Sequence, residues 1–445
     1  MRGTVSAAAK RLEHSRTLRQ FSRSSAAVKV LVINQGSFNL GFYMLLPYLA
    51  GYLTGDLGFA AWAVGLVLGV RSFSQQGMFV VGGTLADRLG YKPVIIAGCI
   101  IRLVGFGSFA VFANLWGIIA AAVLSGLGAA LFSPAVDAYL AHESEEERAE
   151  AFSLFNVFGE SGALLGPLVG VALLGVDFRL ICIVASLLFL ALAIIQIYYL
   201  PARDGVEAAS ETHFLSDWKE ALTNRAFVLF ALAMTGYFVL FNQLYLALPF
   251  EVERLTGSQT GVGVMFALSS LLWVAAQMRT TEALKSSFRP PTSIVLGLAL
   301  MGAAFLPPLA AGPLLPLEGG ALAAAVNLSP VVASALILTV GMMVAKPFAM
   351  DLIPVLSDNR RLGTHYGLYY VFGGIVAAGG NAVAGGFFDL ARATGLTALP
   401  WLALLAVGLV CAAGILALDR RGKLGARETG APPELYEEEP LNRRA

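Results

Sequence analysis

Charged side chains are scarce in this chain. Asp, Glu, Lys and Arg together make up 13% of its 445 residues, and the formal net charge is only +1. This balance gives no sign of the basic surface that binds nucleic acid, so we expect no nucleic-acid partner. In contrast, 57% of the residues are hydrophobic, which is above the usual share in a soluble domain. The composition therefore excludes an ordinary soluble protein.

Cysteine and histidine are also rare. The three cysteines, Cys99, Cys182 and Cys411, lie inside apolar runs, which indicates small core residues and no disulfide framework. The four histidines, at positions 14, 142, 213 and 365, lack the spacing of metal ligands. The absence of a Walker-type phosphate loop argues against an ATP-driven pump. We therefore expect no enzyme, no cofactor and no metal site.

Two further signals are missing. Residues 1–26 are rich in Arg and Ser and lack the apolar core and cleavage site of a signal peptide, so we interpret 1–28 as a basic cytosolic tail. The alternating ten-residue segments of a membrane β-barrel are absent as well. What is present is a series of apolar runs of about 20 residues, the length that crosses a bilayer as a helix.

These apolar runs predict twelve transmembrane helices. Backbone polar groups must be satisfied inside lipid, so continuous apolar runs indicate helices. The polar stretch 202–225 follows the sixth run and indicates a cytosolic linker. The predicted spans are 29–53, 61–84, 93–113, 115–141, 151–175, 180–201, 226–252, 261–282, 292–312, 329–356, 365–390 and 398–419. The sequence therefore predicts an all-α membrane protein.

Lysine and arginine are unevenly divided between the two predicted sides. With both termini inside, the outer loops contain only Arg179, Arg254 and Arg392, and the basic tail and the linker lie inside. Positive charge marks the cytoplasmic side of membrane proteins. We therefore predict cytoplasmic N and C termini, the second in a tail at 420–445.

The two halves of the chain repeat one another. The predicted halves, 29–201 and 226–419, each contain six spans and are related by pseudo-symmetry. Such repeats are typical of transporters that bind their substrate near the midplane, between the halves. The matching pairs are LTG at 53–55 and 255–257, VFG at 157–159 and 371–373, Asp137 with Asp351, and Gly166 with Gly380.

One short turn concentrates charge between two apolar runs. Residues 83–95 read GTLADRLGYKPVI, beginning at Gly83 and containing Gly90. We predict that Asp87 caps the following helix and meets its positive end. Arg88 and Lys92 would stay at the inner interface, so the turn is interpreted as a latch that holds one conformation by charge pairing. The alternative is a positive loop that only sets topology.

This turn is similar to the motif between spans 2 and 3 of the major facilitator superfamily. The twelve spans, the linker and the repeat extend the resemblance over nearly the whole chain. The stretch GALLGPLVG resembles the motif of drug:proton antiporters. Its Gly162, Gly166 and Gly170 form a smooth helix face, and Pro167 permits a bend. The alternative is ordinary packing of small residues.

Other stretches resemble the MdtH-type multidrug-resistance proteins within this superfamily. The resemblance implies proton-driven export of varied amphipathic compounds by a monomer in the bacterial inner membrane. Its partners would then be a small-molecule substrate, protons and the lipid bilayer. The stretches are GVRSFSQQG at 69–77, LSGLGAALF at 124–132, DFRL at 177–180, FDL at 388–390 and LPW at 399–401.

One position departs from the family pattern. Many drug:proton antiporters have an arginine in span 4 where this chain has Ala122. The resemblance implies that this arginine helps proton coupling, so the cation must come from elsewhere. Arg71 and Arg102 are candidates to supply it, and Arg102 is also a candidate for the latch. The alternative for each is an interhelical hydrogen bond or a place at the interface.

Ionisable groups inside the membrane are expensive, so each is a candidate for function. Glu160 is the best candidate for the proton carrier because an apolar setting favours its neutral form. The alternative is a structural pair with Arg71. Asp137 and Asp351 are further candidates for coupling, with pairing at a helix end as the alternative, for instance between Asp351 and Lys346.

Polar and aromatic residues on several spans are candidates for the substrate pocket. Aromatic walls with few polar anchors suit varied hydrophobic ligands. The alternative is hydrogen bonding and packing between helices. The candidates are Asn34, Asn39, Tyr43, Phe155, Asn242, Gln243, Tyr245, Lys346, Tyr369 and Tyr370.

The sequence thus predicts a secondary active transporter that exports small amphipathic compounds in exchange for protons by alternating access. The alternative is a carrier of the same fold for one metabolite, lipid or siderophore, in either direction. A receptor that does not transport is the least favoured hypothesis, because the sequence shows no added signalling domain.

Overall fold

The computed structural model describes residues 19–141, 145–203, 214–312, 316–358 and 361–424. Throughout these ranges the regular structure is helical, and no strand occurs in them. Eleven helical stretches in these ranges are long and apolar enough to cross a membrane. The predicted all-α membrane fold is therefore confirmed.

The helices are named in chain order. The first group consists of α2 (Ala26–Gly51), a π-helical turn (Tyr52–Asp56), α3 (Ala61–Gln76), α4 (Phe79–Leu89), α5 (Tyr91–Val111), α6 (Leu115–Ala141), α7 (Glu145–Leu174) and α8 (Phe178–Tyr199). Within the predicted linker lies α9 (Phe214–Thr223). The second group consists of α10 (Arg225–Ala233), α11 (Thr235–Asn242), α12 (Ala247–Thr256), α13 (Thr260–Ser287), α14 (Pro290–Ala303), α15 (Leu306–Ala311), α16 (Gly320–Leu356), α17 (Leu362–Thr394) and α18 (Leu399–Arg420).

Helix α2 is the predicted span that is missing from the eleven apolar stretches. It has 26 residues, which is long enough to cross a bilayer, but Asn34, Gln35 and Asn39 make it less apolar than the others. The helix packs against α7 and α8. Its polar residues therefore lie among helices, and we count α2 as the twelfth span on its place in the bundle.

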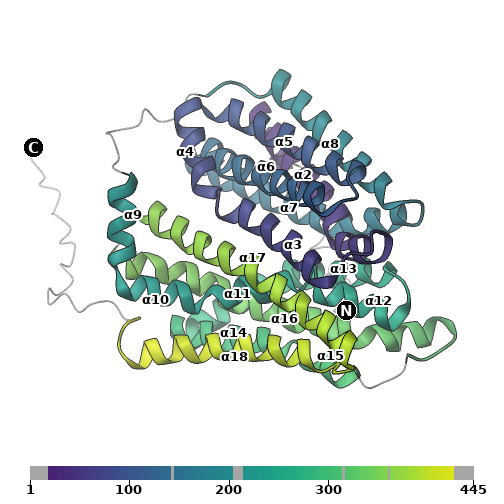
Figure 1. The fold of residues 1–445 in the computed structure, drawn as a ribbon. Coiled ribbons are helices and arrows are strands. Elements are labelled where there is room, and N and C mark those ends of the chain that lie inside the picture. The colour runs from purple at the N-terminus through teal and green to yellow at the C-terminus, as the bar shows by residue number, and fades with distance from the viewer. Residues whose placement is uncertain (1–18, 142–144, 204–213, 313–315, 359–360, 425–445) are drawn as a thin grey trace, which may run out of the picture.

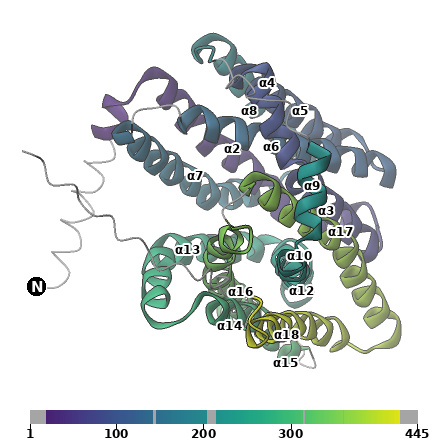
Figure 2. The same ribbon diagram turned by 90° about the vertical axis from the view of Figure 1, so that its left-hand side faces the viewer.

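The helices form two groups that follow chain order. Figure 1 shows α2–α8 in one group, in purple to blue, and α10–α18 in the other, in teal to yellow. The two groups, here called the N-terminal and C-terminal halves, meet mainly along α3 and α17, and α7 packs against α13. Figure 2 shows α3 and α17 side by side in the turned view as well. The exact boundaries of the two halves stay predictions.

Three predicted spans are interrupted helices. The span 61–84 is divided at 77–78, between α3 and α4. The span 226–252 is divided at Met234 and again at 243–246, which gives α10, α11 and α12. The span 292–312 is divided between α14 and α15. Breaks in transmembrane helices are tolerated where neighbouring helices satisfy the freed backbone groups. The break at 243–246 directly adjoins the central cavity described below.

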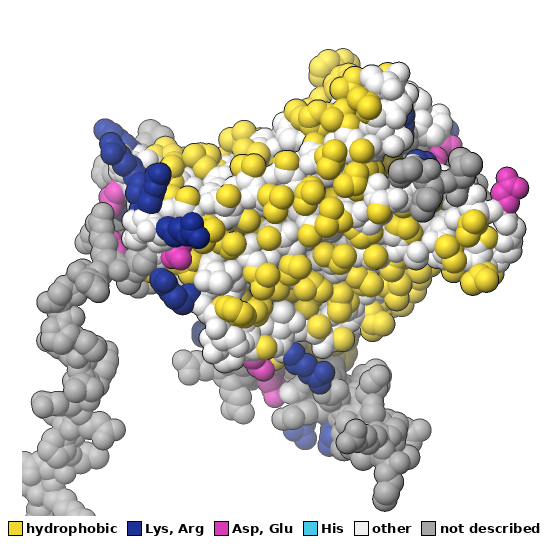
Figure 3. Space-filling model, turned by 90° about the horizontal axis from the view of Figure 1, so that it is seen from below, with side chains coloured by type: hydrophobic (Ala, Val, Ile, Leu, Met, Phe, Trp, Pro, Cys, Tyr) yellow, Lys and Arg dark blue, Asp and Glu magenta, His cyan; other side chains and the backbone are white. Residues whose placement is uncertain are grey.

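The surface is apolar over a broad band. Figure 3 shows hydrophobic side chains across the middle of one face and most of its charged side chains toward the margins. Leu402, Leu409 and Val410 of α18 are among the exposed large hydrophobic residues, which suits contact with lipid. Following the predicted orientation, we call the end with α9 the inner end. The outer end contains the turns after α12 and α17.

Candidate functional site

A cavity of about 260 Å³ lies between the two halves. The N-terminal half contributes one residue of α2 and two of α7, and the C-terminal half contributes residues of α11, α13, α16 and the break at 243–246. The lining consists of Tyr43, Glu160, Ala163, Tyr237, Phe241, Leu244, Tyr245, Phe266, Ser269, Ser270, Trp273, Thr339, Met342 and Lys346. A site between the halves is where a repeated transporter fold binds its substrate.

Aromatic rings form a continuous wall across the two halves. The Tyr245 ring centroid lies 5.2 Å from that of Phe266 and 5.8 Å from that of Phe241. Across the interface, the ring centroids of Tyr43 and Phe266 are 6.4 Å apart. These spacings suit edge-on and tilted aromatic contacts. The wall therefore offers apolar surface to a ligand and also joins the halves.

Two oppositely charged side chains face this cavity. Glu160 is half-buried on α7 of the N-terminal half, and Lys346 on α16 of the C-terminal half is accessible from within the bundle. No ion pair joins these two described residues directly, although each lies within the electrostatic influence of the other. The cavity thus holds one acid and one base, one from each half.

Arg71 and Arg102 lie beside the cavity in the N-terminal half, and neither is part of its lining. Arg71 is 5% exposed, and its guanidinium lies 4.5 Å from the ring centroid of Phe42 and donates to the Gln75 amide oxygen. Arg102 is 1% exposed and lies 3.7 Å from the ring centroid of Phe38. Both cations are held by aromatic faces. Arg71 is therefore not paired with Glu160 in this conformation.

Asp137 and Asp351 lie away from the cavity. Asp137 has an exposed side chain near the end of α6. Asp351 forms an ion pair with Lys285 of α13 at 2.9 Å, and both side chains are about half exposed. The pair of Asp351 with Lys346 that we considered from the sequence is replaced by this contact. The closer partner, Lys285, is far away in the chain and could not be identified from spacing.

The charged turn is tighter than predicted. Asp87 lies in the last turn of α4, and α5 begins directly after its N-cap residue Gly90, so the capping role of Asp87 stays a prediction. Gly90 has a φ of 86°, which only glycine adopts at little cost. Lys92 donates to the carbonyl of Ile197 at 2.8 Å and so ties the turn to α8. Arg102 lies inside the aromatic core of this half, away from the turn.

The glycine motif of α7 packs directly on α2. A methyl group at Gly166 would lie 2.7 Å from Tyr43 Cβ and 3.0 Å from the backbone nitrogen of Met44. Gly162 and Gly170 are even closer to the α2 backbone, as expected for a small-residue helix contact. The Tyr48 hydroxyl donates to the Pro167 carbonyl at 2.5 Å. The motif therefore positions α7, and with it Glu160, against α2 and Tyr43.

The predicted polar pocket residues divide into two groups. Of those candidates, Tyr43, Tyr245 and Lys346 line the cavity. The side chains of Asn242 and Gln243 instead form hydrogen bonds with other helices. Ser72 donates to the Asn242 side chain at 2.7 Å, and Gln243 donates to Asn381 at 3.1 Å. These bonds hold the break at 243–246 against α3 and α17.

The remaining pocket candidates also lie outside the lining. Asn39 donates to the Gly159 carbonyl at 2.9 Å. Asn34 and Phe155 are buried within the N-terminal half. Tyr369 stacks on Phe230, and Tyr370 lies against Phe79 of the opposite half. The positions of these residues agree with the alternative interpretation, in which they hydrogen-bond and pack between helices.

Several lining residues were missed from the sequence. Tyr237, Phe241, Phe266 and Trp273 lie in apolar runs, where an aromatic residue facing lipid has the same local pattern as one facing a cavity. Only Tyr237 and Phe241 carried a usable signal, because they lie about two turns and one turn, respectively, before the predicted pocket residue Tyr245. The others become visible only once the helices are packed.

Comparisons with known proteins agree on one family. The model of the Major Facilitator Superfamily matches residues 31–381. An uncharacterized MFS-type transporter of Mycobacterium tuberculosis is 44% identical over 403 residues, which cover 90% of this chain and 94% of the relative. The multidrug resistance protein MdtH of Cronobacter sakazakii is 32% identical over 383 residues, which cover 85% of this chain and 90% of the relative.

Solved structures show the same fold. A POT family transporter in complex with 5-aminolevulinic acid matches with a TM-score of 0.72 at 14% identity, covering 88% of this chain and 96% of that one. A peptide transporter POT in complex with sulfate matches with a TM-score of 0.72 at 17% identity, covering 92% of this chain and 99% of that one. At such identities the likeness concerns the fold alone.

Proposed function

The chain belongs to the major facilitator superfamily, and we propose that it exports small amphipathic compounds in exchange for protons. Its many apolar helices make it a multi-pass membrane protein of a transporter family. The observation that carries the finer proposal is the cavity between the halves, where an aromatic wall surrounds Glu160 and Lys346. The MdtH relatives, which are named as multidrug resistance proteins, support the export of drug-like compounds.

Glu160 would couple the two fluxes by competition. When its carboxyl is ionised, it offsets the charge of Lys346 and offers an anion to the cationic end of an amphipathic compound. When it is protonated, only the positive charge of Lys346 is left in the cavity, and a cationic compound is released. Since proton and substrate favour different states of one group, each weakens the binding of the other. A proton moving inward can then drive a substrate outward.

A monovalent cation exchanged one for one with a proton moves no net charge, so the pH gradient alone drives that exchange. For a neutral substrate the membrane potential contributes as well. One charge moving through about 100 mV releases about 2.3 kcal/mol. By the rule of tenfold per 1.4 kcal/mol, this concentrates a neutral substrate roughly 50-fold for each proton exchanged. No nucleotide site is needed. The protein would therefore act as a carrier and not as an enzyme, as a monomer in the inner membrane.

A proteoliposome assay tests the coupling role of Glu160. The flux of radiolabelled tetraphenylphosphonium, a lipophilic cation, is measured under an imposed pH gradient at zero membrane potential. Acidifying the compartment toward which the cation moves should stimulate wild-type flux. Glu160→Gln should lose this stimulation by roughly tenfold or more, the usual scale for removing a proton-transfer group.

The matched control is Glu150→Gln, the same change on the same helix. Glu150 is exposed at the inner end, and among the described residues it accepts one long hydrogen bond, 3.4 Å from Gln20. It should keep the gradient dependence of the wild type. If the pH gradient does not stimulate flux in the wild type, proton antiport is wrong. If Glu160→Gln keeps full stimulation, the proton is carried by another group.

A carrier for one metabolite, lipid or siderophore is the second candidate. The observation in its favour is the size of the cavity, about 260 Å³, which is below the range of about 300 to 1,000 Å³ typical of ligand pockets. A panel of unrelated dyes separates the two functions. Competition by many dyes supports multidrug export, whereas transport unaffected by any of them supports a dedicated carrier.

A further inference from the structure

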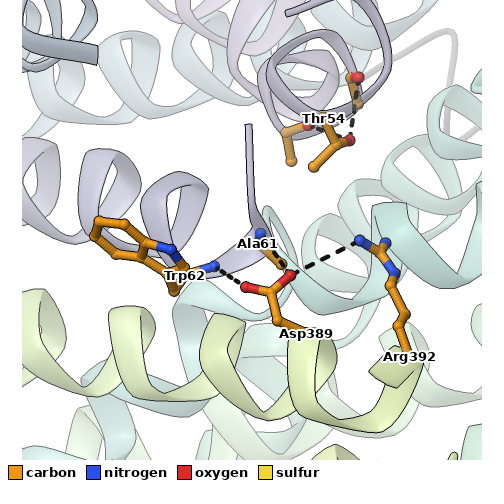
Figure 4. Close-up of polar contacts among 7 residues, drawn as sticks. Thr54, Ala61, Trp62, Asp389 and Arg392 are labelled. Carbon is orange, nitrogen blue, oxygen red and sulfur yellow. Dashed lines mark hydrogen bonds and ion pairs between the residues drawn. The ribbon is translucent and has the colours of Figure 1, made fainter. Parts of the chain in front are cut away.

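Asp389 of α17 forms a direct polar link between the outer ends of the two halves. Its two carboxylate oxygens accept hydrogen bonds from the backbone N–H groups of Ala61 and Trp62, each at 2.9 Å. These donors are the first two residues of α3, in the opposite half. Figure 4 shows the carboxylate lying between them and Arg392.

The start of α3 needs such an external acceptor. The first N–H groups of a helix have no partner within it, and a polar residue at the N-cap normally supplies one. Here the N-cap residue is Ala60, which makes no side-chain cap. The next amide, that of Ala63, bonds to the Ala60 carbonyl at 3.0 Å. Asp389 therefore satisfies the two amides that α3 itself leaves open.

The surrounding packing brings the two helices close enough for this bond. Gly385 lies one turn before Asp389, and a methyl group there would overlap the backbone of Ala61. Further along, Gly65 lies directly on the Asn381 carbonyl in the same way. Arg392 lies 4.0 Å from the Asp389 carboxylate and near the Phe250 ring, which keeps a positive charge beside the carboxylate.

We propose that Asp389 is a clamp that closes the outer end of the transporter by capping a helix of the opposite half. Opening the cavity to the outside requires α3 and α17 to separate at this end, and each cycle would then break both hydrogen bonds. The inference rests on the proposed alternating access, because only a transporter whose halves separate needs such a bond. A cap of this kind contributes enough to bias an equilibrium without locking it.

Pulsed electron paramagnetic resonance measures the effect directly. Spin labels are placed at Ala113→Cys and Leu396→Cys, two exposed outer positions in opposite halves, with the three native cysteines replaced by serine. In lipid, the labelled parent should show mainly the short distance. Asp389→Ala should raise the ratio of long to short distances about tenfold, equal to about 1.4 kcal/mol. Asp389→Asn, which keeps one acceptor oxygen, should give an intermediate ratio.

Asp177→Ala is the matched control. Asp177 also caps a helix at the outer end, accepting from Arg179 N–H at 2.7 Å, but both residues belong to the N-terminal half. Its loss should leave the distances unchanged. The clamp is refuted if Asp389→Ala and Asp389→Asn match the parent, or if Asp177→Ala shifts the distances as much. The measurement uses neither substrate nor pH gradient, so its outcome is separate from that of the Glu160→Gln assay.

Discussion

Lys346 on α16 and Lys285 on α13 lie in different environments. Lys346 faces the cavity that contains Glu160, whereas Lys285 pairs with Asp351 outside it. A positive charge a few ångströms from a bound cation costs roughly 1 to 4 kcal/mol, depending on the local dielectric. Lys346→Gln should therefore raise the affinity for a cationic amphipathic compound relative to a neutral one by roughly tenfold.

Inhibition of transport by one cationic and one neutral compound of similar size measures this ratio. Lys285→Gln removes the same charge outside the cavity and should leave the ratio within about twofold, because exposed ion pairs contribute little. Equal effects of the two substitutions would show that Lys346 acts only through the overall charge of the bundle.

At this scale, the sequence predicted the chemistry of single residues better than their partners. Glu160 and Lys346 were candidates because charges inside a membrane are expensive, and the structure places both at the cavity. The same argument selected Asp351, whose partner Lys285 lies on another helix. It also selected Arg102, which is enclosed by aromatic rings. Periodicity does not specify which face of a hydrophobic helix meets which neighbour, so these environments could not be predicted.

At the scale of helices, the contact between α2 and α7 sets the place of Glu160. The atoms that a methyl group at Gly166 would meet include the Leu40 carbonyl at 3.0 Å, and backbone atoms cannot move aside as a side chain can. Gly166→Ala should therefore force the helices apart and destabilise the protein by about 1 to 3 kcal/mol. The thermal unfolding midpoint in detergent and lipid should fall by several degrees.

Gly379→Ala is the control for this substitution. Gly379 lies in the middle of α17, and a methyl group added there meets no atom within 4 Å among the described residues. Its unfolding midpoint should stay level or rise slightly, because alanine favours a helix more than glycine does. A midpoint for Gly166→Ala equal to that of the control would contradict the close packing of α2 and α7.

The break between α11 and α12 has a local cause that a count of apolar runs does not consider. The residues 240–246 contain neither proline nor glycine, but Pro249 lies four residues after Tyr245 and can neither donate to the Tyr245 carbonyl nor fit beside it in a continuous helix. The break is held by tertiary contacts, chiefly Ser72 to Asn242 and Gln243 to Asn381. Asn242 and Gln243 were interpreted as pocket residues because they are polar in an apolar run. The same polarity serves the break, which in turn presents Tyr245 to the cavity.

At the scale of the whole molecule, the sequence repeat and the apolar runs led to the correct family and fold. The apolar runs also predicted a span at 29–53, where α2 packs in the bundle, although α2 is less apolar than the eleven other stretches. A helix among other helices tolerates amides that a lipid-facing helix would not, so hydropathy underestimates it. Twelve crossings would place both termini on the same side of the membrane, whereas eleven would place them on opposite sides.

Labelling of single cysteines in intact cells tests the twelfth crossing. Arg23 and Asp56 are exposed residues on either side of α2, and Lys219 lies on α9. With cytoplasmic termini and twelve spans, an impermeant maleimide should label Asp56→Cys but neither Arg23→Cys nor Lys219→Cys until the membrane is opened. Cys411 is partly exposed and is replaced by serine, and Cys99 and Cys182 should give little background because they are buried. Labelling of Arg23→Cys in intact cells would place the N-terminus outside, so that α2 would not cross and the positive-inside argument would fail for the first half.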